Sequence, residues 1–107
     1  MILKQALWRM MPVLLGCGAM LRAETVVDQK DRKFSVTEVT VKPGEKVSFK
    51  NSDDVAHNVF SVTPGLEFEI QRQGPGEKSA VPFNKEGTVE VRCSIHPRMK
   101  LTVNVKK

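Results

Sequence analysis

The chain has 107 residues, with 17 basic and 12 acidic side chains and a formal net charge of +5, so it has room for one small domain. Nucleic acid is excluded as an expected partner, because no basic run is interleaved with aromatic residues. Tyr is absent and the single Trp lies at position 8, within the first 23 residues.

Residues 1–23 have the order of an export signal. Lys4 and Arg9 precede an apolar run that ends at Leu21, and Ala23 stands before the polar Glu24. The apolar run is shorter than the about 20 residues that a permanent membrane span needs. We therefore expect cleavage after Ala23 and a periplasmic domain over residues 24–107.

Cleavage would lower the net charge to +2, because three of the 17 basic residues lie in the signal and 14 would remain against 12 acidic ones. Two alternatives stay open for this segment. Leu14-Leu15-Gly16-Cys17 resembles a bacterial lipobox, which would attach the protein to a membrane through Cys17. The other alternative is a buried N-terminal helix.

Residues 24–107 alternate between short β-rich runs and turn sequences. Val47 and Phe49 alternate with polar neighbours, as do Val89 and Val91, and no long helical period competes. The predicted turns are Lys42-Pro43-Gly44-Glu45, Thr63-Pro64-Gly65, Gly74-Pro75-Gly76 and Asn84-Lys85-Glu86-Gly87. Several short strands predict an all-β sandwich or barrel.

The apolar phase slips between Val36 and Val39, from even to odd positions. Such a slip indicates a bulge or a strand that changes sheets.

The predicted domain concentrates its sulfur and imidazole groups. It contains one Cys, one Met and two His, and Cys93, His96 and Met99 fall within seven residues. A lone thiol in an oxidising compartment requires an explanation, and buried inertness, intermolecular pairing, covalent catalysis and metal ligation are the candidates. Only metal ligation also explains the short spacing to His96 and Met99.

Strand phase predicts where these side chains point. Cys93 shares a face with Val91, and Met99 and His57 share a phase with the apolar residues of their own runs. All three are expected to point inward. His96 is expected in the loop between the last two strands.

A thiolate and two imidazoles with a weak axial thioether suit copper in both oxidation states. Zinc prefers four strong ligands, and the Cys-x-x-Cys-His motif of haem attachment is missing. Considered one at a time, Met99 is explained by core packing, His57 by a hydrogen-bonded histidine in the interior, and Cys93 by an inert buried thiol. Together with His96 they predict one copper ion and leave no nucleophile or base, so no enzyme is expected.

The chain resembles the cupredoxins, and in particular amicyanin and plastocyanin-like proteins. The run Cys93-Ser94-Ile95-His96-Pro97-Arg98-Met99 is similar to the short Cys-x-x-His-Pro-x-Met ligand loop of amicyanin. Ala56-His57-Asn58-Val59 resembles the first-histidine motif of the family, and the similarity covers Glu24 to Lys107.

The resemblance implies a Greek-key β-sandwich with one type I copper held by His57, Cys93, His96 and Met99. It also implies a contact between Asn58 and Ser94 behind the ligands. The exposed edge of His96 would pass one electron to redox partners such as a periplasmic dehydrogenase or a c-type cytochrome. Ile95, Pro97 and Arg98 would surround that edge, and the protein would act as a monomer.

Arg98 departs from the family pattern, in which an apolar residue is more typical at that position. The positive charge suggests an acidic or mixed patch on the partner, because charges at the rim of an interface mainly steer the encounter.

Two other functions are also compatible with the sequence. Copper storage, delivery or resistance would treat the ion as cargo held by the same four residues. An immunoglobulin-like interaction domain with an incidental thiol would bind no stoichiometric copper.

Overall fold

The computed structural model describes residues 24–107, which form nine strands and no helix. The strands are β1 (Thr25–Lys30), β2 (Lys33–Phe34), β3 (Glu38–Val41), β4 (Glu45–Asn51), β5 (His57–Ser61), β6 (Phe68–Gln73), β7 (Lys78–Phe83), β8 (Gly87–Cys93) and β9 (Lys100–Val105). The predicted signal over residues 1–23 and the alternative lipid attachment at Cys17 lie outside the described residues. No helix in the described part of the chain is long and apolar enough to cross a membrane.

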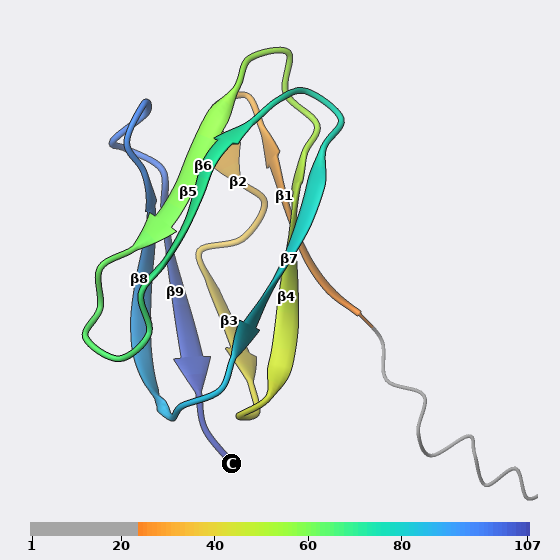
Figure 1. Cartoon of the computed structure of the whole chain (residues 1–107). Coiled ribbons are helices and arrows are strands. Elements are labelled where there is room, and N and C mark those ends of the chain that lie inside the picture. Colours follow the sequence, from red (N-terminus) through yellow and green to blue (C-terminus); the bar gives the residue numbers. More distant parts are fainter. Residues whose placement is uncertain (1–23) are drawn as a thin grey trace, which may run out of the picture.

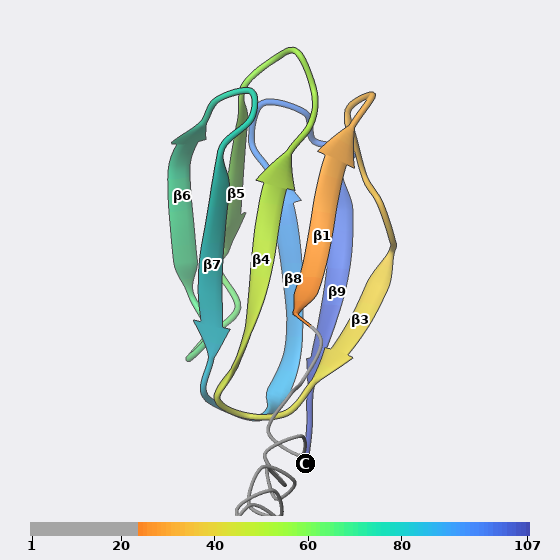
Figure 2. The ribbon, with the colours of Figure 1, turned by 90° about the vertical axis from the view of Figure 1, so that its right-hand side faces the viewer.

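The strands form two sheets that pack face to face, as Figures 1 and 2 show. One sheet has the order β2-β1-β4-β7 and the other has the order β3-β9-β8-β5-β6. Parallel pairing joins β1 to β4 and β3 to β9, whereas the other neighbours are antiparallel. The predicted all-β sandwich is confirmed.

The chain changes sheets between β2 and β3. Phe34 at the end of β2 belongs to the sheet of β1, whereas β3 pairs with β9 in the other sheet. Val36 lies between these strands and is exposed, and Val39 is half-buried. The phase slip between Val36 and Val39 therefore marks a crossing from one sheet to the other, which was one of its two predicted causes.

Three predicted turns form around Pro-Gly pairs. In Lys42–Glu45, Thr63–Leu66 and Gly74–Glu77 the N–H of the fourth residue donates to the carbonyl of the first, at 3.0, 2.9 and 3.1 Å. Gly44 has a φ of 94° and Gly65 a φ of 81°, a left-handed conformation that favours glycine. Proline sets the preceding corner, so local chemistry defines where each strand ends.

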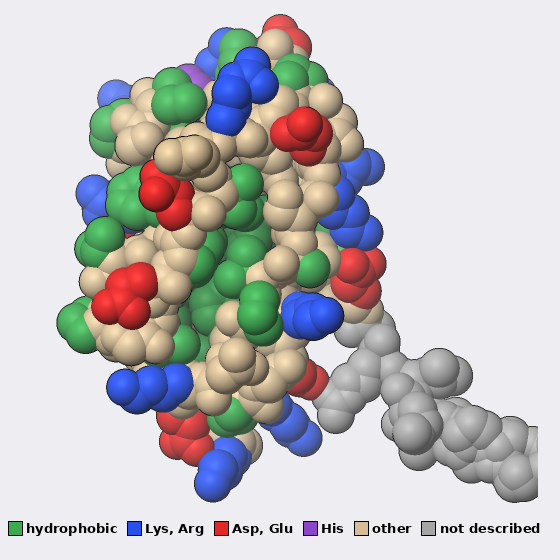
Figure 3. Space-filling view, viewed as in Figure 1, with side chains coloured by type: hydrophobic (Ala, Val, Ile, Leu, Met, Phe, Trp, Pro, Cys, Tyr) green, Lys and Arg blue, Asp and Glu red, His purple; other side chains and the backbone are tan. Residues whose placement is uncertain are grey.

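The core lies between the sheets and consists mainly of valine and phenylalanine. Four rings form a row, with centroid separations of 6.4 Å for Phe34 and Phe49, 6.0 Å for Phe49 and Phe68, and 5.8 Å for Phe68 and Phe83. The side between β6 and β7 is hollowed, and apolar side chains are visible through it in Figure 3. Phe68 and Phe83 of this row line the opening.

A buried polar network joins the sheets near the β4–β5 loop. Gln29 Nε2 donates to Gln73 Oε1 at 2.6 Å, and Gln73 Nε2 donates to the carbonyl of Phe49 at 2.9 Å. Asn51 Nδ2 donates to the carbonyls of Val55 and Gln73 at 2.9 and 3.0 Å. These bonds fix the start of the β4–β5 loop, because buried amides are costly unless they are paired.

Core packing by the valines of β8 can be tested with a matched pair of substitutions. Val89 is 0% exposed, whereas Val62 is 76% exposed. We expect Val89→Ala to lower the free energy of unfolding by about 2 to 3 kcal/mol, since it removes two buried methyl groups and leaves a cavity. Val62→Ala should change it by less than about 0.5 kcal/mol. Denaturant unfolding measures both, and equal effects would contradict the proposed core.

Candidate metal centre

Three elements bring side chains with nitrogen and sulfur donor atoms to one end of the sandwich. His57 is the first residue of β5, Cys93 is the last residue of β8, and His96 lies in the β8–β9 loop. Because β5 pairs with β8 and Val59 lies opposite Cys93, the start of β5 and the end of β8 are neighbours. Figure 2 shows the β4–β5 and β8–β9 loops at the same end of the domain.

The three ligand atoms form a small triangle. Cys93 Sγ lies 3.8 Å from His57 Nδ1 and 3.9 Å from His96 Nδ1, and the two Nδ1 atoms are 3.2 Å apart. His57 and Cys93 are buried and His96 is partly exposed. The group could therefore hold one metal ion at its centre.

The size and chemistry of this triangle fit a trigonal metal site. Bonds of roughly 2.0 Å to nitrogen and 2.3 Å to sulfur, with angles near 120°, would separate the two nitrogens by about 3.5 Å and each nitrogen from sulfur by about 3.7 Å. Two imidazole nitrogens and one sulfur are the set that blue-copper sites use. A metal ion between these three atoms would also remove the repulsion between their lone pairs, which point toward the same position.

Asp53 in the β4–β5 loop determines which nitrogen of His57 is available. His57 Nε2 lies 3.0 Å from Asp53 Oδ2, and the His57 side chain is 0% exposed. A carboxylate only accepts, so Nε2 carries the proton and donates it. In the neutral ring that a metal ligand requires, Nδ1, which faces Cys93 and His96, then carries the free lone pair.

Asp53 is ionised by its surroundings. The backbone N–H of Arg32, followed by the His57 ring and the backbone N–H of Asp54, holds the pKa of Asp53 well below its usual range, although burial acts in the opposite direction. Arg32 N donates to Asp53 Oδ2 at 2.9 Å, and the Arg32 guanidinium lies 3.7 Å from Oδ1. The β1–β2 turn thus contacts the support of His57.

His96 completes the triangle from the surface side. Burial is the main cause that lowers the pKa of His96 below its ordinary value. The ring centroids of His57 and His96 are 4.9 Å apart with planes inclined by 64°. A lowered pKa favours the neutral imidazole, which is the form that binds metals.

The sulfur of Cys93 receives one backbone hydrogen bond. Asn58 N donates to Cys93 Sγ at 3.4 Å, which ties the sulfur to the β5 backbone. The Asn58 side chain donates to the carbonyl of Gln71 at 2.9 Å and to Glu69 at 3.2 Å. Ser94 is exposed, and the contact expected between Asn58 and Ser94 stays a prediction.

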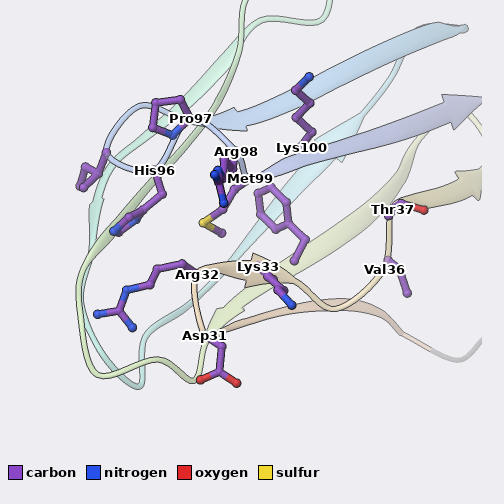
Figure 4. Close-up of a pocket in the computed structure, with 12 residues that line it drawn as sticks. Asp31, Arg32, Lys33, Val36, Thr37, His96, Pro97, Arg98, Met99 and Lys100 are labelled. Atoms are coloured by element: carbon purple, nitrogen blue, oxygen red, sulfur yellow. The ribbon is translucent and has the colours of Figure 1, made fainter.

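Met99 precedes β9 and points into the domain, as its phase predicted. Its side chain is 2% exposed, and its N–H donates to the His96 carbonyl at 2.9 Å, which closes the ligand loop. Figure 4 shows the sulfur of Met99 turned toward the side on which His96 lies. The expected inward orientation of His57 and Cys93 is likewise confirmed by their burial.

Sequence reasoning missed Asp53 and Arg32. Ser52-Asp53-Asp54 reads as an exposed polar turn, and nothing in its composition distinguishes the buried carboxylate from its exposed neighbour. The only available signal was that Asp53 stands four residues before His57.

Comparisons with known proteins agree with this geometry. The family model described as copper binding proteins of the plastocyanin/azurin family matches residues 21–106. Amicyanin-alpha of Methylorubrum extorquens is 38% identical over 79 residues, which cover 69% of this chain and 65% of that protein. Amicyanin of Paracoccus denitrificans is 33% identical over 85 residues, which cover 76% of this chain and 64% of that protein. The match thus spans just under two thirds of the length of these relatives.

Solved structures with the same fold include copper proteins. A reduced Cu(I) form of an amicyanin variant superposes with a TM-score of 0.72 at 27% identity, covering 80% of this chain and 85% of the other. A copper-containing nitrite reductase from Thermus scotoductus SA-01 superposes with a TM-score of 0.73 at 23% identity, covering 81% of this chain but 23% of that chain. The second similarity concerns the fold alone.

Proposed function

The chain belongs to the copper-binding plastocyanin/azurin family, and from this premise we propose that it is an exported one-electron carrier of the periplasm. The observation that carries the proposal is the triangle of His57 Nδ1, Cys93 Sγ and His96 Nδ1, in which His57 and Cys93 are buried and His96 is half-buried. These three residues would hold one copper ion, and the Met99 thioether would be a fourth, weaker donor.

The surroundings of the triangle suit electron transfer. Bound copper supplies the redox chemistry by cycling between Cu(I) and Cu(II). The protein holds the ligands in place: His57 and Cys93 lie on paired strands, and Asp53 fixes the His57 ring. Side chains held in this way would move little between the two oxidation states, which favours fast electron exchange.

His96 offers the route to a partner. Of the three proposed ligands, His96 alone is half-buried and not buried, and it lies in the loop beside the exposed Ile95 and Pro97. A redox partner such as a periplasmic dehydrogenase or a c-type cytochrome would contact this edge. The metal would occupy the thiolate, the thioether and both imidazoles of this domain, so none of these groups would remain to act as a nucleophile or base.

Copper storage or delivery is a less suitable function for this geometry. A delivery site has to release its ion, whereas Cys93 is 1% exposed and His57 is 0% exposed. Transfer of copper to a competing metal-free protein within minutes would favour delivery. Slow loss of copper combined with a reversible one-electron wave in voltammetry favours the carrier.

The ligand role of Cys93 can be tested by Cys93→Ser, which removes the thiolate and preserves the shape of the side chain. We expect the copper-loaded wild type to show an intense visible absorption from thiolate-to-copper charge transfer and the variant to lack it. Circular dichroism of both proteins checks that the variant is folded. A folded variant that keeps the band would remove Cys93 from the ligand set.

The role of Met99 can be separated from core packing with a matched control. We expect Met99→Leu to bind copper and to raise the reduction potential, because it removes a thioether that stabilises Cu(II). Leu101→Met alters a neighbouring side chain that is 1% exposed and should leave the potential unchanged. Voltammetry measures both. Equal potentials in wild type and Met99→Leu would make Met99 a packing residue only.

A further inference from the structure

A groove beside His96 separates the ligand loop from the β1–β2 turn. It has a volume of about 670 Å³, and its walls come from residues 31–37 on one side and residues 95–100 on the other. Figure 4 shows His96 and Arg98 on the loop side opposite Arg32 and Lys33 on the turn side. The groove thus starts at the edge through which we propose electrons leave.

Positive charge dominates the walls of the groove. Arg32, Lys33, Arg98 and Lys100 line it, together with one acidic residue, Asp31. Arg32 already contacts Asp53 and Asp54 at 3.7 and 4.0 Å. The other three cations are exposed and form no salt bridge within 4 Å to another residue of the range 24–107.

The turn side also brings two like charges together. Lys30 and Lys33 lie opposite each other in the register of β1 and β2. Like charges opposite each other in a hairpin are unfavourable in the isolated domain, and an incoming carboxylate would relieve the repulsion.

Apolar side chains supply the rest of the contact surface. Phe34 and Met99 form a buried floor, and Val36 and Ile95 are 41% and 52% exposed at the edges. An apolar floor with a cationic rim suits a chain segment that carries both carboxylates and apolar side chains. Single-stranded nucleic acid fits less well, because Phe34 is the one aromatic residue of the lining and it is buried.

We propose that this groove docks an acidic, partly apolar segment of the redox partner protein and places that partner beside His96. The inference rests on the proposed electron-carrier function and adds the position and chemistry of the partner. Lys33, Arg98 and Lys100 would pair with its carboxylates, and the floor of Phe34 and Met99 would receive its apolar side chain.

The test uses copper-loaded Cu(I) protein and a hexapeptide of Glu and Leu, with the corresponding Gln and Leu peptide as a neutral probe. Chemical shifts of the backbone amides locate binding. We expect shifts in residues 31–37 and 95–100 with the acidic peptide only. The double variant Lys33→Glu, Lys100→Glu should bind at least tenfold more weakly, whereas Lys46→Glu, an exposed position at the start of β4, should bind like the wild type.

Several outcomes would overturn the docking proposal: equal binding by the double variant, shifts spread over all lysines, or equal binding of inorganic phosphate or of a single-stranded oligonucleotide. The visible band and the voltammetric wave are recorded for each variant. If they are normal and the peptide does not bind in the groove, docking alone fails. If they are missing in the wild type, the electron-carrier function fails.

A separate observation concerns the interior, where Asp53 connects three parts of the structure. Its carboxylate accepts from His57 Nε2 at 3.0 Å, from Arg32 N at 2.9 Å and from its own chain at Asp54 N at 3.1 Å. Asp53 N in turn donates to Asn51 Oδ1 at 2.9 Å, which ties the loop to the buried polar network. The Asp53 side chain is 4% exposed, so these contacts are shielded from water.

We infer that Asp53 is a positioning residue for copper, acting through His57. This inference also rests on the proposed metal site. The carboxylate keeps the proton on Nε2 and orients the ring, and its negative charge favours Cu(II) over Cu(I).

Two variants separate charge from geometry. Asp53→Asn keeps an oxygen that can accept from Nε2 but removes the charge, so the reduction potential should rise with little change in the visible band. Asp53→Ala also removes the acceptor, and copper affinity should fall 10- to 100-fold. Asp54→Asn is the control, because Asp54 also contacts Arg32 but its side chain is 87% exposed.

A purely structural role would lower the thermal unfolding temperature of the metal-free variants without moving the potential or the copper affinity. That result, or equal potentials in Asp53→Asn and Asp54→Asn, would refute the inference. Loss of the visible band in the wild type would instead refute the metal site.

Discussion

The pairing of β5 with β8 is the constraint on which the metal centre depends. Val59 lies opposite Cys93, and His57, two residues earlier on the same face, therefore reaches the end of β8. A slip of one residue would turn His57 and Cys93 to opposite faces of the sheet. The apolar side chains oppose that slip, because it would expose Val59 if β5 turned over, or Val89 and Val91 if β8 did, and each of these is 0% exposed. Core packing thus sets the geometry of the ligands.

Strand phase and turn chemistry made much of this predictable. The period of two placed Cys93, Met99 and His57 in the interior, and Pro-Gly pairs marked three of the turns. Pairing partners were not predictable, because parallel contacts between β1 and β4 and between β3 and β9 join segments that are distant in sequence and have no local signature. The phase slip between Val36 and Val39 indicated that the chain departs from a regular strand there. Only the structure distinguishes a change of sheet from a bulge.

The residues that support His57 from behind could not be predicted from the sequence, for a physical reason. Asp53 and Asp54 are chemically identical neighbours, and burial of the first depends on where the β1–β2 turn lies. That turn has Asp31 and Arg32 at φ values of 53° and 56°, a conformation that costs a residue such as Arg32 about 1 to 2 kcal/mol. The hydrogen bond from Arg32 N to the ionised Asp53 helps to offset this cost, so turn and loop stabilise each other.

Arg32 therefore connects the buried part of the site with its exposed part. Its backbone N–H contacts the carboxylate that holds His57, and its side chain lines the groove beside His96. The two imidazoles of the triangle are thus supported differently: His57 by a buried charge, and His96 by a loop that is free to contact a partner. Since the turn is bonded to the carboxylate that holds His57, the wall of the groove that the turn forms is held in position relative to His57. A partner that fills the groove would consequently meet His96 in a defined orientation, which a mobile wall could not provide.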